Sequence, residues 1–291
     1  HRQVGSTIKP YLYSLAMENG MTPCDLVPNQ QHTYGNWTPR NGSNARYGEM
    51  VPLKWALAQS NNWISAYLIN KYGPGALVQI MKNFGIRHNI ENPNLTLCLG
   101  TCEISLKEMV SAYTAFANHG MRVAPLMVTS IEDNNGTVIE RFHTSTNEAI
   151  SSSSAYRMVD MLKAVIDQGT GRRLRGRYAL TAEIAGKTGT TQTNSDGWFV
   201  GMVPRLVAGC WVGGENRNIH FNSTAMGQGA SMALPIWALF IKKVFNDPTL
   251  GYSPKEKFQI PSDFKYCDDS ALSADSLGAG EVPEEFYEIT L

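Results

Sequence analysis

The sequence lacks both a long hydrophobic run and an excess of charge of one sign. It has no stretch of about eighteen apolar residues, so no segment is predicted to span a bilayer. Its 25 basic side chains balance 25 acidic ones, which gives no case for nucleic acid as the main partner. The chain does not begin with Met, and its first motif starts at Ser6 with no signal peptide ahead of it. We therefore expect it to be cut from a longer protein.

Cysteine is scarce and odd in number, with 5 in the chain, so complete pairing within one chain is excluded. Cys98 and Cys102 are close enough in sequence to form a disulfide, and their C-x3-C spacing also fits half of a zinc site. No second Cys/His pair lies nearby in sequence and the histidines have no metal-ligand spacing, so we predict no metal site. A disulfide and two buried free thiols both remain open for this pair.

The charge that is present is unevenly distributed. Residues 251–291 carry 9 acidic and 3 basic side chains, a net charge of −6, which leaves +6 on residues 1–250. After Cys267 this tail is also rich in Ser, Gly, Pro and Ala, a composition that is poorly suited to a core. We interpret the chain as one domain over residues 1–250 followed by an acidic, solvated extension over residues 251–291.

The expected elements follow a simple order: helices, then antiparallel strands, then a last helix. A hairpin is predicted over residues 127–142, turning at Asn134-Asn135-Gly136. Apolar periodicity and stop signals predict helices over residues 6–19, 52–59, 63–72, 76–84, 105–120, 154–168 and 230–245, and strands over 183–190, 197–203 and 205–212. This order predicts an α+β domain with an antiparallel sheet flanked by helices.

Three short motifs occur along the chain: Ser6-Thr7-Ile8-Lys9, Ser60-Asn61-Asn62 and Lys187-Thr188-Gly189-Thr190. Ser6 and Lys9 are three residues apart at the start of a predicted helix and therefore share a face. A serine hydroxyl becomes a good nucleophile only beside a base. A lysine can be that base when burial or a second cation, such as Lys187, keeps its amine neutral.

Each motif alone also fits ordinary structure. Ser6 could be a helix N-cap with Lys9 in solvent, Ser60-Asn61-Asn62 a polar link between helices, and Lys187 a solvated residue at a strand end. Ser262-Asp263-Phe264-Lys265 matches the first pattern by chance. The order of the three motifs, and the uniqueness of Lys-Thr-Gly in the chain, favour chemistry over these interpretations.

The trio is a signature of penicillin-binding proteins and class A β-lactamases, and the surrounding sequence resembles the transpeptidase domain of class A, bifunctional penicillin-binding proteins. The resemblance covers about residues 2–245. It is carried by Arg2-Gln3-Val4-Gly5 before Ser6, and by Trp37-Thr38-Pro39-Arg40-Asn41, Ala56-Leu57-Ala58-Gln59, Gly169-Thr170-Gly171, Ala185-Gly186 before Lys187, and Asp196-Gly197-Trp198-Phe199-Val200-Gly201. It implies the serine penicillin-binding protein/β-lactamase-like fold, with an all-helical subregion beside the sheet.

The resemblance also implies a D,D-transpeptidase that cross-links peptidoglycan stem peptides and is acylated by β-lactams, with no cofactor. Ser6 would attack the D-Ala-D-Ala carbonyl and Lys9 would take its proton. Ser60 and Lys187 would pass a proton to the leaving amine. Asn62 would hold the donor amide, Lys187, Thr188, Gly189 and Thr190 would form the carboxylate-binding strand, and the N–H groups of Ser6 and Thr190 would form the oxyanion hole. The expected location is extracytoplasmic, on the periplasmic face of the inner membrane.

Two other functions share this machinery: a serine β-lactamase, and a β-lactam sensor that binds without turnover. A β-lactamase needs a carboxylate to activate water, and Glu91, Glu103, Glu108 and Glu140 have no clear claim to that role. A non-catalytic scaffold is disfavoured because every motif residue is present. The resemblance further implies strands ahead of Ser6 that this sequence lacks, so we expect the strand near residues 205–212 to have an unpaired edge in this chain alone, or to pair with a separate peptide. A strand from within the chain at that edge, such as part of residues 121–142, would contradict this.

Overall fold

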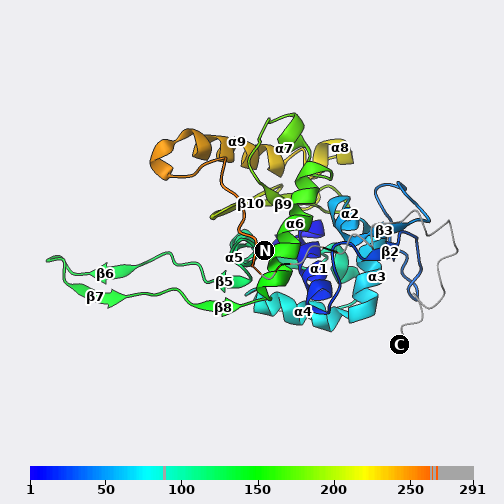
Figure 1. Ribbon diagram of the computed structural model, residues 1–291, viewed down its shortest axis with the longest axis horizontal. Helices are drawn as coiled ribbons and strands as arrows, with labels where there is room; N and C mark the ends of the chain where they lie inside the picture. The colour runs from blue at the N-terminus through cyan, green and yellow to red at the C-terminus, as the bar shows by residue number, and fades with distance from the viewer. Residues whose placement is uncertain (88–89, 263, 265–266, 268–291) are drawn as a thin grey trace.

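The computed structural model describes residues 1–87, 90–262, 264 and 267, and it has the expected α+β architecture (Figure 1). A helical region lies on one side of an antiparallel sheet, and a last helix lies on the other. The helices are α1 (Lys9–Glu18), α2 (Leu53–Ala58), α3 (Asn62–Tyr72), α4 (Pro74–Asn83), α5 (Leu106–Ala117), α6 (Ser152–Asp167), α7 (Arg173–Gly176), α8 (Thr224–Gly227) and α9 (Ala233–Asn246), with 3-10 turns η1 (Gly5–Ile8), η2 (Leu95–Leu99) and η3 (Pro248–Leu250).

The three predicted strands form one antiparallel sheet in the order β11-β10-β9. They are β9 (Ala185–Thr190), β10 (Asp196–Val203) and β11 (Leu206–Gly213). One face is covered by α9, where Trp237 packs edge-on against Phe199 with ring centroids 5.1 Å apart. The opposite face is covered by α5 and α6 (Figure 1). Helices on both faces explain why every residue of β10 is buried.

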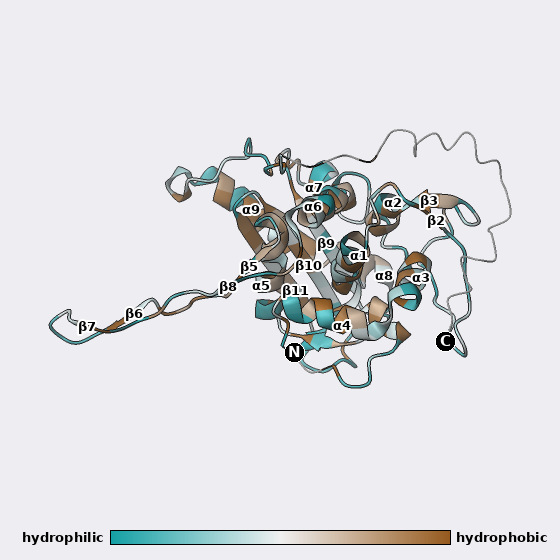
Figure 2. Cartoon of the chain, turned by 60° about the horizontal axis from the view of Figure 1, so that its bottom comes forward, coloured by the Kyte–Doolittle hydropathy of each residue, from teal (hydrophilic) through white to brown (hydrophobic). Residues whose placement is uncertain are grey.

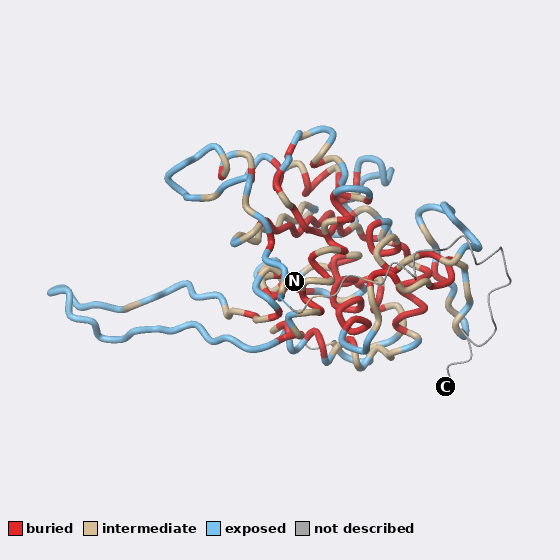
Figure 3. Tube along the Cα trace, in the orientation of Figure 1, coloured by how far each residue is buried: buried red, intermediate tan, exposed pale blue. Residues whose placement is uncertain are grey.

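The predicted hairpin forms a long arm that projects from the body (Figures 1 and 3). Its strands are β6 (Ser130–Glu132) and β7 (Val138–Arg141), and at its base β5 (Met121–Val123) pairs with β8 (Thr146–Glu148). These strands pair only with one another, and within the described residues no strand pairs with the outer edge of β11. Residues 121–142 therefore do not occupy that edge, and the expectation of strands ahead of Ser6 stays a prediction.

Helix α1 runs through the middle of the helical region and is buried on all sides (Figure 3). Tyr11 packs against Phe84, Tyr113 and Phe116, with ring centroids 5.0 to 6.3 Å apart. The sequence predicted a helix with one apolar face, but a helix surrounded by protein has no polar face to present. The hydropathy colouring of Figure 2 shows the apolar residues gathered in this helical region and at the sheet. The segment that carries the first motif is therefore anchored in the core.

Short strands that the sequence did not predict fix the connecting loops. Strand β1 (Arg2–Gln3) pairs with β4 (Glu103–Ile104), and β2 (Leu26–Pro28) pairs with β3 (Met50–Pro52). These segments of two or three residues are too short to give a readable alternation of apolar and polar side chains.

The one disulfide among the described residues joins two cysteines that the sequence did not pair. Cys24 and Cys267 form this bond, whereas Cys98 and Cys102 are free thiols. Of the two arrangements left open for Cys98 and Cys102, the structure therefore has the one without a cross-link. No group of three or more potential metal ligands occurs among the described residues.

The described part of residues 251–267 packs against the body. Phe258 is buried, and Glu256 accepts hydrogen bonds from Arg205 at 2.6 and 2.8 Å. The composition of residues 251–291 did not predict this packing. The division at residue 250 stays a prediction, and residues 268–291 lie outside the described residues.

We expect Cys24→Ser to lower the free energy of unfolding by about 2–4 kcal/mol, because the disulfide closes a very long loop and restricts the unfolded chain. Denaturant unfolding without reductant measures this. Cys210→Ser, which removes a free thiol, is the matched control. Equal unfolding midpoints for Cys24→Ser and the wild type would show that the cross-link does not stabilise the domain.

Candidate active site

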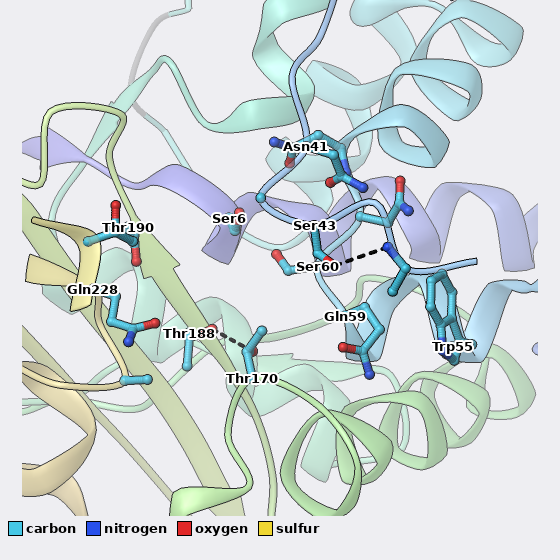
Figure 4. A pocket seen from close by; sticks show the side chains of 16 residues that line it. Ser6, Asn41, Ser43, Trp55, Gln59, Ser60, Thr170, Thr188, Thr190 and Gln228 are labelled. Atoms are coloured by element: carbon cyan, nitrogen blue, oxygen red, sulfur yellow. Dashed lines mark hydrogen bonds between the residues drawn. The ribbon is translucent and has the colours of Figure 1, made fainter. Parts of the chain in front are cut away.

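The first motif lies directly against the end of β9. Gly5 has a φ of +53°, and a Cβ atom at this position would come within 2.6 Å of the Thr190 carbonyl oxygen. Its N–H donates to the Gly100 carbonyl at 3.2 Å. Only glycine allows both the positive φ and this close approach. Consequently Ser6, the next residue, stands beside Thr190, and both line the same cleft (Figure 4).

Lys9 begins α1, and its side chain is fully buried. Its Nζ donates to the Ser60 carbonyl and to Asn62 Oδ1, each at 2.6 Å, with longer contacts of 3.3 Å to Ser60 Oγ and the Asn61 carbonyl. Burial lowers the pKa of Lys9 from 10.5 to about 7. A neutral amine keeps two N–H groups, enough for the two short bonds, and gains a lone pair that can accept a proton.

Lys187 is the second fully buried lysine of the site. It donates to Ser60 Oγ at 2.9 Å and to the Thr188 carbonyl at 3.1 Å. Burial, followed by the charge of Lys9, lowers its pKa well below the ordinary value. Within the described residues, no carboxylate lies within ion-pair distance of either lysine. Each of the two amines therefore lacks a counter-charge, and burial disfavours its charged form.

Ser60 joins the two lysines at the break between α2 and α3. Its backbone is left-handed, with a φ of +55°, a strained conformation for a residue with a side chain that commonly marks functional sites. Asn61 holds the break in place, because it caps α3 by accepting from the Ile64 N–H at 3.1 Å and donates to Asn29 Oδ1 at 2.6 Å. These contacts explain why the helix break predicted from the sequence occurs at Ser60 and Asn61.

Asn62 is held by the loop that contains Arg40 and Asn41. The sequence analysis used this segment for the family resemblance but assigned it no role. Its backbone N–H donates to Asn41 Oδ1 at 2.9 Å, and its side-chain amide donates to the Arg40 carbonyl at 2.7 Å. The Pro39 carbonyl accepts from Trp63 Nε1 at 3.2 Å. Within the described part of the chain, the second amide hydrogen of Asn62 has no acceptor and can reach a ligand in the cleft.

The four residues of the Lys-Thr-Gly-Thr motif divide between the cleft and the interior. Thr188 and Thr190 line the cleft. Gly189 faces away from it, because a Cβ atom there would meet the Val4 carbonyl at 2.8 Å and Thr7 Cγ2 at 2.9 Å. The space beside this glycine is thus occupied by the chain's own nucleophile segment.

A buried carboxylate braces the turn that follows this strand. Asp196 accepts from Trp211 Nε1 at 3.1 Å and from Ser195 Oγ at 3.0 Å, and it lies 3.6 Å from the guanidinium of Arg217. Trp198, two residues on, donates from Nε1 to the Gln3 carbonyl at 2.9 Å. The Asp-Gly-Trp segment therefore ties β10 to the residues just before Ser6.

The cleft has a volume of about 390 Å³, and among the residues that the structure describes its lining contains no acidic side chain (Figure 4). Sequence reasoning found part of the lining and gave no role to the rest, which is Asn41, Gly42, Ser43, Ala45, Trp55, Gln59, Asn61, Thr170, Thr224, Gln228 and Ala230. Asn41, Gln59 and Thr170 lie within segments that carried the family resemblance. Thr224 and Gln228 lie in a segment where the sequence has no motif that could have identified them.

The glutamates weighed as water-activating bases all lie outside this lining. Glu108 completes the capping box of α5 with Ser105. Glu140 lies on the exposed arm, and Glu91 and Glu103 line a separate pocket. The described cleft therefore offers no carboxylate for hydrolysis of an acyl group on Ser6.

Comparison with known proteins places this geometry in a family. The family model for the penicillin binding protein transpeptidase domain matches residues 2–209. Penicillin-binding protein 1A of Aquifex aeolicus is 35% identical over 269 residues, covering 89% of this chain and 35% of that protein. Penicillin-binding protein 1A of Neisseria meningitidis is 33% identical over 254 residues, covering 83% of this chain and 31% of that protein. The chain thus spans about a third of the length of these relatives.

Solved structures agree on the fold. Penicillin-binding protein 1A from Haemophilus influenzae matches 90% of this chain and 44% of its own, with a TM-score of 0.78 at 24% identity. The penicillin-binding protein PonA1 from Mycobacterium tuberculosis matches 90% of this chain and 71% of its own chain, with a TM-score of 0.76 at 23% identity. The class A resemblance is confirmed, and the chain belongs to the penicillin-binding protein transpeptidase domain family.

Proposed function

We propose that this chain is a serine D,D-transpeptidase that cross-links peptidoglycan stem peptides through an acyl-enzyme on Ser6. The observation that carries the proposal is the contact of two buried lysines with one serine hydroxyl, Ser60, beside the cleft that Ser6 lines. A buried amine without a carboxylate partner supplies both a base for the nucleophile and a site for an anionic ligand.

In the proposed acylation, Ser6 Oγ attacks the carbonyl carbon of the D-Ala-D-Ala bond while its proton passes to the neutral amine of Lys9. The backbone N–H groups of Ser6 and Thr190 stabilise the oxyanion. The C–N bond then breaks, and Ser60 with Lys187 passes a proton to the leaving amine of the terminal D-Ala. An amine of a neighbouring stem peptide attacks the ester, releases Ser6 and forms the cross-link.

The donor carboxylate meets Lys187, Thr188 and Thr190 in this proposal. An anion beside Lys187 favours its protonated form, so binding restores the charge that burial removes. Asn62 uses its free amide hydrogen to hold the donor peptide. β-Lactams mimic the donor and trap Ser6, in line with the solved imipenem acyl-enzyme complex of penicillin-binding protein A from M. tuberculosis, which matches this fold with a TM-score of 0.71.

The absence of acidic side chains from the cleft lining favours transpeptidation over the β-lactamase alternative, since hydrolysis needs a base for water. The proposal requires no metal or organic cofactor, and its partners are donor and acceptor stem peptides and β-lactams, with no nucleic acid. The proposed location is extracytoplasmic, where peptidoglycan is cross-linked. Among the described residues, no helix has the length and hydropathy needed to cross a membrane.

A fluorescent penicillin should label the protein at Ser6, and Ser6→Ala should abolish the label, because the proposal assigns the other lysine-bonded serine of the cleft, Ser60, to proton transfer and not to attack. Intact mass with peptide mapping identifies the modified residue. Ser262→Ala, which removes the chance Ser-x-x-Lys match in the tail, is the control and should label like the wild type. An adduct that persists on Ser60 or Ser262 in Ser6→Ala would contradict the assignment.

The label should persist for many minutes after excess penicillin is removed, because none of the described residues that line the cleft is a carboxylate that could activate water. Fluorescence of the denatured protein, sampled over time, measures the lifetime. Rapid catalytic hydrolysis of nitrocefin would instead identify a β-lactamase.

A further inference from the structure

The loop that follows α6 bridges the second and third motifs. Thr170 donates its backbone N–H to the Ala58 carbonyl at 3.1 Å, and Gln59 Nε2 donates to the Gln168 carbonyl at 3.1 Å. A Cβ atom on Gly169 would lie 2.1 Å from the Ala58 carbonyl oxygen, so the approach needs glycine. The loop is thereby held against the end of α2, and Thr170 lines the cleft.

Two threonines of β9 each have a hydrogen-bond partner from another segment. Thr190 Oγ1 accepts from the backbone N–H of Gly229 at 3.0 Å. A backbone N–H can only donate, so the Thr190 hydroxyl keeps its own hydrogen for a ligand. Thr188 Oγ1 lies 2.7 Å from Thr170 Oγ1, where either hydroxyl can be the donor (Figure 4).

We propose that Thr170 is a positioning residue that directs the Thr188 hydroxyl toward a carboxylate and so sets the preference of the cleft for carboxylate-ended ligands. The inference rests on the proposed function. When Thr170 donates to Thr188, the Thr188 hydrogen is free to be donated to an anionic oxygen. In the opposite orientation, Thr188 presents only lone pairs to the ligand, which an anion repels.

The bond between the two hydroxyls also strengthens the hydrogen bond that Thr188 can donate. A hydroxyl that accepts one hydrogen bond becomes a better donor of the next, since chains of hydrogen bonds polarise one another. A carboxamide depends less on the orientation of the Thr188 hydroxyl. Its own N–H groups can donate to Thr188 Oγ1 when Thr188 donates to Thr170. Loss of the Thr170 hydroxyl should therefore weaken carboxylate ligands more than carboxamides.

The test compares acylation of the wild type and of Thr170→Val by a penicillin and by the carboxamide of the same penicillin. Valine has nearly the shape of threonine and keeps the backbone bond to Ala58. We expect the second-order acylation rate constant for the carboxylate to fall by about 5-fold. This is the effect of losing one hydrogen bond between neutral groups, here the bond between the Thr170 and Thr188 hydroxyls. The rate constant for the carboxamide should change by less than about 2-fold.

Two variants are controls. Thr170→Ser keeps the hydroxyl and should restore the carboxylate preference, and Thr224→Val removes a different cleft-lining hydroxyl and should leave the preference unchanged. Equal losses for both ligands in Thr170→Val, or no loss for either, would overturn the positioning role. Absence of any acylation at Ser6 in the wild type would instead overturn the proposed function itself.

Discussion

The burial of two lysine side chains around one serine hydroxyl is the constraint on which the site depends. An isolated ammonium group in a protein interior is costly unless it is paired or loses its proton. Lys9 and Lys187 are both fully buried, and no carboxylate within the described residues compensates them. The fold meets this cost with carbonyl, amide and hydroxyl acceptors from Ser60, Asn61 and Asn62, and with lowered pKa values. The same compensation leaves an amine able to accept a proton.

The rest of the domain keeps this cluster in register. Helix α1 is surrounded by core residues, which fixes the backbone of Lys9. Close backbone approaches at Gly5 and Gly189 set the nucleophile segment against β9. The Asn41 loop and the Thr170 loop hold the break between α2 and α3 from two sides. Elements far apart in sequence thus converge on a few polar atoms, and small shifts in any of them would move the reacting groups.

Much of this arrangement could be predicted from sequence because it depends on local signals. The start of the helix at Ser105, the turn at Asn134-Asn135-Gly136 and the break between helices at Ser60 each occur where the residue types predicted them. Long-range features could not be predicted in this way. The pairing of Cys24 with Cys267 depends on how the chain wraps across 243 residues of sequence separation.

The cleft shows the same division. The motifs and the resemblance identified Ser6, Lys9, Ser60 and Lys187. In the structure both lysines contact the Ser60 hydroxyl, and Ser6 and Ser60 line one cleft. The direction in which Gly189 points follows from the packing of β9 against Val4 and Thr7, which no local pattern encodes. Thr224 and Gln228 reach the cleft from a segment without any motif, so only the folded chain places them there.

The central claim is that burial leaves Lys9 neutral near physiological pH. A titration of ¹³Cε-labelled lysine by NMR tests it most directly, with the Lys9 signal assigned by its loss in Lys9→Met. The account predicts a midpoint near 7: the amine is protonated below that pH and free to accept the Ser6 proton above it. A midpoint close to the ordinary lysine value of about 10.4 would contradict the account, because Lys9 would then be charged throughout the physiological range.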